Sequence, residues 1–185
     1  VKRYKDGDLI AARGDPPDEW IACARGAVRV SSTSISGKQI TLTYVEPGIW
    51  FGDVAIFDGD RRTHDAYAHG DSTILCVAKA DFKKILATHV ELYEAMLRLH
   101  ARRIRQLFGL VEDLNTLPLR ARLAKQLVHL VRSYGVPSLA DAREMRISLH
   151  LAQEELAQLL GASRQRVNQE LKAMEREESI RIEPG

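Results

Sequence analysis

The stretch that organises this chain is residues 88–117, THVELYEAMLRLHARRIRQLFGLVEDLNTL. Apolar or semi-polar side chains recur in it with alternating steps of four and three residues, at Tyr93, Leu97, His100, Ile104, Leu107, Val111 and Leu114. This spacing is typical of the seam of a two-stranded coiled coil. So long a seam is unusual for an ordinary amphipathic helix in a single small core. The spacing therefore predicts a dimerisation helix, with contacts made by Leu97, His100, Ile104, Leu107, Val111 and Leu114.

Local signals mark both ends of this predicted helix. Thr88 followed by Glu91 matches a capping box, which predicts that the helix begins there, and Pro118 predicts its end. We expect a short helix at residues 81–86 to lead into it. A second apolar stripe on another face is predicted to pack against the segment that precedes the helix, and consists of Leu92, Met96 and Leu99.

Length and composition restrict the class of protein. The chain has 185 residues, 45% hydrophobic and 28% charged, as expected for one large or two small globular domains. No apolar run approaches the length of a membrane span and no secretory signal is visible, so we expect a cytoplasmic protein with no membrane contact. Because the chain starts at Val1 and stops at Gly185 within a predicted element, we expect that it is truncated at both ends.

The two cysteines and six histidines favour no metal site. Cys23 and Cys76 each lie in a strand-like run, which predicts buried thiols in a reducing compartment. Two thiolates are too few for an iron–sulfur cluster that needs four. The histidines show no close spacing of the kind that metal ligands use, and His100 in the seam is predicted to be a packed histidine rather than a haem ligand.

Residues 1–80 have the pattern of an antiparallel β structure. Short runs of alternating character are separated by glycine, proline and aspartate turns, which predicts a compact barrel or sandwich. Residues 48–57 break this alternation, and Arg62 follows shortly after. A glycine that lets the backbone approach, free N–H groups at a helix start and an arginine together suit a phosphate group. The alternative is a glycine turn with a surface arginine, and the spacing alone does not decide between them.

The residues after Pro118 are predicted to form a small helical domain. An amphipathic helix runs from Leu119 to Tyr134 and is ended by Gly135. We expect a loop at residues 136–144 and a short strand at residues 145–149. Residues 116–185 carry 11 Lys and Arg against 9 Asp and Glu, so the net charge of +2 lies here, a weak indication of nucleic acid.

Residues 152–175 have the pattern of a helix-turn-helix. Ala157 allows a close helix crossing, Gly161 suits the turn and Ser163 suits the cap of the second helix. Apolar side chains of the second helix are predicted to point inward, at Val167, Leu171 and Met174. The outward residues have side chains that read base edges and phosphates, and they are Arg164, Gln165, Asn168, Gln169 and Lys172. A plain helical hairpin with a solvated polar face is the alternative.

The series Gly52, Asp53, Val54, Ala55 and Ile56, followed by Arg62 and Thr63, resembles the phosphate-binding cassette of cyclic-nucleotide-binding domains. With the long helix and the helix-turn-helix, nearly the whole chain resembles the Crp/Fnr superfamily of bacterial transcription regulators. The resemblance implies an α+β fold with an N-terminal β-roll at residues 1–88, a dimerisation helix at 89–117 and a winged helix-turn-helix domain at 118–185. Residues 177–183 are then the first strand of the wing.

The resemblance also implies partners and sites. The partners are a second copy of the chain, double-stranded DNA with a two-fold symmetric operator, and RNA polymerase. Ser163 and the outward residues of the second helix are the implied DNA contacts, with Arg164 matching the family arginine that contacts a guanine. The implied effector site comprises Gly52, Asp53, Val54, Ala55, Arg62, Thr63, Leu107 and Phe108. No catalytic residues and no metal ligands are implied.

This chain departs from the cyclic-AMP binders of the family at the effector site. Asp53 stands where those proteins have a glutamate that binds the ribose, and His64 stands where they have an alanine. Leu107 and Phe108 match two hydroxyl residues that hold the adenine. An adenine edge left unpaired there costs about 1–3 kcal/mol. We therefore expect a cyclic nucleotide or another anionic effector, with cyclic AMP itself disfavoured.

Two other classes remain open on the sequence alone. One is a ligand-binding module that regulates a protein partner and uses its C-terminal helices for docking. The other is a cupin-like β-barrel enzyme, which needs several metal ligands inside the barrel. His64 and His69 alone do not supply such a set.

Overall fold

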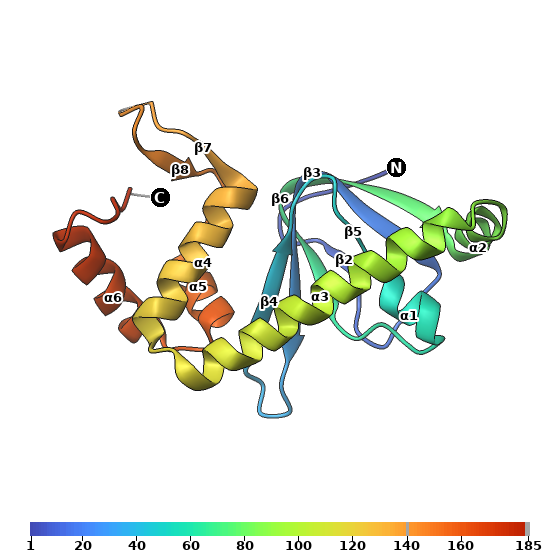
Figure 1. Ribbon diagram of the computed structural model, residues 1–185, viewed down its shortest axis with the longest axis horizontal. Coiled ribbons are helices and arrows are strands. Elements are labelled where there is room, and N and C mark those ends of the chain that lie inside the picture. Colours follow the sequence, from blue (N-terminus) through green and yellow to red (C-terminus); the bar gives the residue numbers. More distant parts are fainter. Residues whose placement is uncertain (140, 184–185) are drawn as a thin grey trace. The chain divides into compact units, whose positions relative to one another are not determined.

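The computed structural model describes residues 1–139 and 141–183, which form two compact units (Figure 1). The first unit comprises residues 1–32 and 43–113, and the second comprises residues 33–42 and the described part of 114–185. The end predicted for the C-terminal domain, at residue 185, lies outside the described residues. The fold is α+β as predicted, with an antiparallel sheet first and most of the helices after it.

The sheet contains six strands in the order β1-β6-β3-β4, with β2 paired to β6 and β5 paired to β3. Their bounds are β1 (Lys2–Tyr4), β2 (Leu9–Ala11), β3 (Glu19–Thr33), β4 (Gln39–Val45), β5 (Trp50–Phe51) and β6 (Asp65–Ala78). The two long strands, β3 and β6, pair antiparallel along most of their length. The alternating pattern of residues 1–80 therefore predicted the strand class correctly.

A bulge bends the central pair of strands. The register of β3 against β6 shifts between Cys23 and Ala27, and Gly26 lies in this interval with φ 82°. A Cβ atom on Gly26 would lie 2.4 Å from Oγ of Ser72, so only glycine permits this approach. The core inside the bent sheet consists of Ile21, Cys23, Val28, Val45, Ala66 and Ile74.

The two cysteines have the inert character that the sequence predicted. Cys23 is buried in the core of the sheet, and burial raises the pKa of its thiol to about 11. Cys76 is half-buried, and burial raises its pKa as well. Neither group is a thiolate at neutral pH, so neither has the character of a reactive or metal-binding cysteine.

Three helices complete the first unit: α1 (Asp53–Asp58), α2 (Lys79–Thr88) and α3 (Glu91–Thr116). The predicted start of the long helix at Thr88 is wrong. The Oγ1 atom of Thr88 donates to the carbonyls of Lys84 and Ile85, at 3.0 and 3.2 Å, so this hydroxyl belongs to the last turn of α2. A short turn follows, and α3 begins at Glu91. The residues of a capping box are present, but the hydroxyl of Thr88 is already hydrogen-bonded within α2.

The second apolar stripe of α3 packs inward, as predicted. Met96 is buried together with Phe82 and Leu86 of α2 and Ile56 of α1, and Leu92 and Leu99 pack against the same cluster. In Figure 1, α3 runs along the first unit close to α1 and β5. The helix is therefore attached to the sheet domain by one face only.

From Leu119 onward, the described residues of the second unit form three helices and a two-stranded ribbon. Their bounds are α4 (Leu119–Tyr134), β7 (Gly135–Pro137), β8 (Met145–Ile147), α5 (Gln153–Leu160) and α6 (Arg164–Arg176). The predicted loop at residues 136–144 is partly wrong, because Val136 and Pro137 pair with Arg146 and Met145 in the ribbon. The predicted short strand at residues 145–149 is present as β8.

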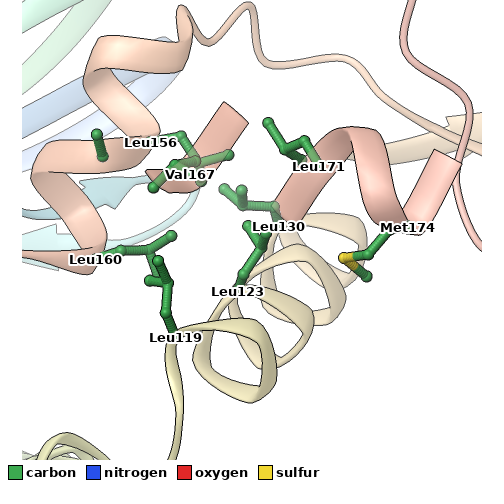
Figure 2. Packing of buried hydrophobic residues seen from close by; sticks show 9 residues of the cluster. Leu119, Leu123, Leu130, Leu156, Leu160, Val167, Leu171 and Met174 are labelled. Carbon is green, nitrogen blue, oxygen red and sulfur yellow. The ribbon is translucent and has the colours of Figure 1, made fainter. Parts of the chain in front are cut away.

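The core of this unit brings the three helices together (Figure 2). Leu123 and Leu130 of α4 point towards Val167 and Leu171 of α6 in this view. Gly161 has φ 61° and ends α5, as the turn of the predicted motif requires. The buried side chains are Leu119, Leu123, Leu130, Leu156, Ala157, Leu160, Val167, Leu171 and Met174.

The strand predicted at residues 177–183 is absent from the described residues of that segment. Ile180 nevertheless packs against the helical core. Arg181 pairs with Glu144 at 2.9 Å, and Glu183 pairs with Arg146 at 2.8 Å. In the described residues, side-chain ion pairs rather than a backbone ladder therefore connect this segment to the β8 region.

Candidate effector cassette and DNA-binding helix

The cassette turn is built around Gly52, which precedes α1 with φ 80°. A Cβ atom on this residue would lie 2.6 Å from Nη1 of Arg62. The positive φ favours glycine at this position, and a larger residue would also displace the guanidinium of Arg62. The strand before the turn, β5, is fixed by its pairing with Ile21 and Ala22 of β3.

Arg62 is held at the cassette by the backbone. Its Nη2 atom donates to the carbonyl oxygen of Glu19 at 2.8 Å. Burial lowers the pKa of this arginine, and the nearby carboxylates of Glu19, Asp15 and Asp18 oppose that shift. The group remains a cation, since arginine titrates far above neutral pH. Burial removes part of its hydration, which strengthens its attraction for an anion.

One face of Arg62 borders an open cavity of about 380 Å³. Its lining includes Asp15, Asp18 and Glu19, together with Ile10 and Ile21. Three acidic residues make this cavity a poor site for an anion. The Gly52 turn, where Nη1 of Arg62 lies, is therefore the better candidate for an anion site.

Asp53, the first residue of α1, is 1% exposed and faces α3. Its Oδ2 atom accepts a hydrogen bond from Nη1 of Arg103 at 2.8 Å and lies 3.1 Å from Nε2 of His100. The other amino group of Arg103, Nη2, donates to the carbonyl oxygen of Trp50 at 2.8 Å. Arg103 thus binds the backbone before the Gly52 turn and the side chain after it.

Two buried atoms of this cluster, Oδ1 of Asp53 and Nε2 of His100, make no hydrogen bond within the described residues. The Oδ1 atom of Asp53 is buried and makes no hydrogen bond to any residue that the structure describes. A buried carboxylate oxygen without a donor is costly, so this atom can accept a hydrogen bond from a group that enters the cassette.

The remaining predicted cassette residues are placed as follows. Ala55 is buried, whereas Val54 is exposed on α1. The hydroxyl of Thr63 is 2.7 Å from Nδ1 of His64. Leu107 and Phe108 lie one turn beyond Arg103 on α3, and their side chains are 60% and 70% exposed.

The predicted seam residues of α3 divide into two groups. Leu97, Ile104, Leu107, Val111 and Leu114 are all between 50% and 69% exposed. The side chain of His100 is only 29% exposed, because its ring contacts Asp53 and lies edge-on to Phe57 with the ring centroids 5.7 Å apart. His100 is therefore a packed histidine as predicted, but its partners belong to its own sheet domain.

Arg103 is the functional candidate that the sequence reasoning missed. A signal was present, because the inward stripe of Leu92, Met96 and Leu99 continues with a step of four to residue 103. A charged residue at the end of an apolar stripe requires a partner if it is buried. The sequence did not reveal that Asp53 would be that partner.

The second candidate site is the exposed face of α6. The Oγ atom of Ser163 accepts a hydrogen bond from the backbone N–H of Arg166 at 3.4 Å, which is the predicted N-cap. The residues expected to face outward are exposed, namely Arg164, Gln165, Gln169 and Lys172. Asn168 differs, because it is half-buried and its Oδ1 atom has no hydrogen-bond partner in the described chain.

The structure also shows what positions α6. Arg122 of α4 donates from Nη1 to the carbonyl oxygen of Leu160 at 2.9 Å and so caps the C-terminal end of α5. At the other end of α5, Glu155 accepts from the backbone N–H of Ala152 at 2.9 Å, which supplies half of a capping box without a hydroxyl residue. Both ends of α5, the first helix of the motif, are therefore held by side-chain hydrogen bonds.

Within the described ranges, no group of three or more His, Cys, Asp or Glu residues is placed to hold a metal ion. No described helix has both the length and the apolar character that crossing a bilayer requires.

Both candidate sites lie in segments that match known protein families. Residues 1–89 match the cyclic nucleotide-binding domain, and residues 121–185 match the Crp-like helix-turn-helix domain. The chain is 31% identical to the CRP-like cAMP-activated global transcriptional regulator of Mycobacterium tuberculosis, over 97% of this chain and 79% of that protein. It is 29% identical to the cyclic AMP receptor protein of Thermus thermophilus, over 98% of this chain and 80% of that protein.

Solved structures show the same similarity. A CRP-family transcriptional regulator from Thermus thermophilus superposes with a TM-score of 0.79 at 25% identity, covering all of this chain and 89% of that chain. FixK2 from Bradyrhizobium japonicum superposes with a TM-score of 0.87, covering all of this chain and 88% of that chain, and at 17% identity the likeness is one of fold. The cupin-like enzyme is excluded, because the matched proteins are regulators. This chain is a member of the Crp/Fnr family of DNA-binding transcription regulators, with a cyclic-nucleotide-binding type of sensor domain and a Crp-like helix-turn-helix.

Proposed function

We propose that this regulator works as a homodimer and that two α6 helices read a two-fold symmetric operator under the control of a small anionic effector. In this proposal residues 1–88 sense the effector, residues 89–117 dimerise and residues 118–185 bind DNA. The observation that carries the proposal is the exposed apolar seam of α3, from Leu97 to Leu114. Regulated transcription further requires RNA polymerase as a partner and a cytoplasmic location.

The seam supports a second copy of the chain as its occupant. Its residues follow the four-and-three spacing of a paired helix, and a second apolar stripe of α3 is already buried on the sheet domain. Fully burying an aliphatic side chain contributes roughly 1.5–3 kcal/mol. The five seam side chains are 50–69% exposed, so each supplies only part of that amount, and the sum over two chains favours a dimer. Two-fold pairing also gives two copies of α6, as a symmetric operator requires.

DNA binding is tested by titrating the full chain onto labelled duplexes at several salt concentrations. We expect two chains per duplex and an affinity that falls steeply with salt, because lysine and arginine release counterions from the phosphates. A module that acts only on a protein partner would show no salt-dependent binding to any duplex. That result would refute the DNA-reading role of α6 in this chain.

The effector proposal rests on Arg62 and Asp53. The guanidinium of Arg62 fills the space that Gly52 leaves and offers positive charge at the turn, and Oδ1 of Asp53 offers an acceptor for a hydroxyl group. An anion with a hydroxyl group, such as a nucleotide, satisfies both. Two relatives are named for cyclic AMP. Leu107 and Phe108 offer no hydrogen bond to an adenine, so we expect cyclic AMP to bind weakly.

The effector site is tested by thermal unfolding with cyclic nucleotides as probes. A ligand that binds only the folded chain raises its unfolding temperature by mass action. We expect Arg62→Ala to abolish the rise caused by any active nucleotide. Arg61→Ala is the matched control, because Arg61 is exposed and its guanidinium donates to the carbonyl oxygen of Gly14, outside the cassette. If both variants lose the rise in unfolding temperature equally, or if Arg62→Ala keeps it, Arg62 does not bind the effector.

A further inference from the structure

The exposed face of α6 is defined by the face that the core buries. Val167, Leu171 and Met174 are the buried residues of the helix, with steps of four and three. Gln165, Gln169 and Lys172 repeat the same steps two residues earlier. At 3.6 residues per turn, a shift of two residues is roughly 200° around the axis, so these three side chains occupy the centre of the outward face. Any surface that approaches α6 meets them first.

The flanking residues are less well placed to enter a groove. Asn168 is half-buried. Arg164 lies at the first turn, next to the cap formed by Ser163, where it can reach a phosphate or a base beside the groove entrance. The central positions near the N-terminus of α6 are therefore two glutamines, one turn apart.

Glutamine has a distinct preference among base edges. Its amide donates and accepts at once, which is the complement of adenine, where N6 donates and N7 accepts. Guanine presents two acceptors on the same edge, so it suits an arginine or lysine fork and leaves one group of a glutamine unpaired. Residues four apart on a helix are separated by about 6 Å along its axis, close to two base-pair steps.

We propose that Gln165 and Gln169 are the specificity-determining residues of α6 and that they select adenines within about two base pairs of each other in each half-site. The proposal rests on the DNA-reading role of α6 argued above. Lys172, one turn further along the same face, binds a phosphate and fixes the helix in its groove. Each half-site thus combines an A·T-preferring centre with sequence-independent backbone contacts.

The test is selection of binding sites from a random duplex pool by the full-length chain and its variants. The wild type is expected to enrich adenines at two neighbouring positions in each of two half-sites one helical turn apart. Gln165→Ala and Gln169→Ala should each remove the enrichment at one of these positions. The ratio of affinities for the A·T duplex and the duplex with G·C at that position should fall about five- to 150-fold in each variant, the range of one bidentate contact. Gln169→Arg should change the preference at its position from adenine to guanine.

Lys172→Ala is the control, and it should weaken binding to all duplexes alike without changing the selected sequence. Enriched sites that keep a G·C requirement in Gln165→Ala and Gln169→Ala would overturn the readout but leave DNA binding intact. If neither the wild type nor any variant enriches a duplex, and none shows salt-dependent DNA binding, the DNA-reading role of α6 is refuted. The two failures are therefore distinguishable.

Discussion

At the scale of single residues, the contact between Arg103 and Asp53 is the most consequential. Asp53 is 1% exposed, and Arg103 supplies its direct donor. Removing one partner of a buried ion pair leaves the other charge uncompensated, and this is worth about 3–5 kcal/mol. Because the Arg103 side chain is 30% exposed, we expect Arg103→Ala to lower the free energy of unfolding by about 3 kcal/mol, at the lower end of that range.

Urea denaturation measures this change, with Arg102→Ala as the control, since Arg102 is exposed. A loss in Arg103→Ala no larger than in the control would show that the pair is not formed in solution. A double variant with Asp53→Leu and Arg103→Met should recover much of the lost stability, because no charge is then left buried. Together with the two single variants, this double variant forms a mutant cycle that separates the Asp53–Arg103 interaction energy from the loss of side-chain packing.

His64 provides a prediction about pH. Burial, followed by the nearby charge of Arg13, lowers the pKa of His64 below 6.5. The unfolded chain therefore binds a proton on this residue more readily than the folded chain, so acidification from pH 8 to about pH 5 lowers the stability of the folded state. We expect His64→Gln to reduce the acid-induced fall of the unfolding temperature. The same fall in the variant and the wild type would contradict this, and His129→Gln at an exposed position is the control.

At the scale of elements, α3 shows which features the sequence could predict. Its two stripes, one buried and one exposed, follow from residue spacing alone, and the structure confirms that Leu92, Met96 and Leu99 pack inward. The predicted start of α3 was wrong, because the local sequence does not reveal that the hydroxyl of Thr88 is bound to α2. The Asp53–Arg103 contact joins residues 50 positions apart, so it depends on the path of α3 across the sheet domain and not on any local pattern.

The seam prediction is tested by Ile104→Asp combined with Val111→Asp. The side chains of Ile104 and Val111 are 50% and 57% exposed in the single chain, so the change should leave its fold intact. In a dimer, these aspartates would lie close to their two-fold mates in an apolar contact, at a cost of several kcal/mol. Analytical ultracentrifugation should show a monomer, and operator binding should be lost.

The control is Arg102→Asp combined with Gln106→Asp, which adds negative charge at exposed positions outside the seam. This variant should remain a dimer. An intact dimer for the Ile104 and Val111 variant would refute the seam as the dimer contact, and a monomeric control variant would show that charge rather than position decides.

At the scale of the whole molecule, the proposed function links effector binding and DNA binding through one chain. If an effector raises the affinity for operator DNA by some factor, the operator must raise the affinity for that effector by the same factor. The sequence predicted the fold class, because its patterns are local: alternating strands in residues 1–80, and a helix-turn-helix with its cap after Pro118. The wing was the less predictable part, since residues 177–183 are held by ion pairs with Glu144 and Arg146 instead of by strand pairing.

Effector selectivity gives the last prediction. Leu107 and Phe108 place apolar side chains where the resemblance implies contacts to an adenine, and a donor or acceptor left unpaired there costs about 1–3 kcal/mol. We expect the variant with Leu107→Thr and Phe108→Ser to bind cyclic AMP about tenfold or more tightly than the variant with alanine at both positions. The alanine variant is the matched control, because it also removes the seam leucine and the bulk of the phenylalanine. Isothermal titration with cyclic AMP measures both affinities, and titration with operator DNA present tests the linkage in the same experiment. Equal affinities in the two variants would show that residues 107 and 108 do not face the base of the nucleotide. Recognition of the effector would then rest on the contact between its anionic group and Arg62.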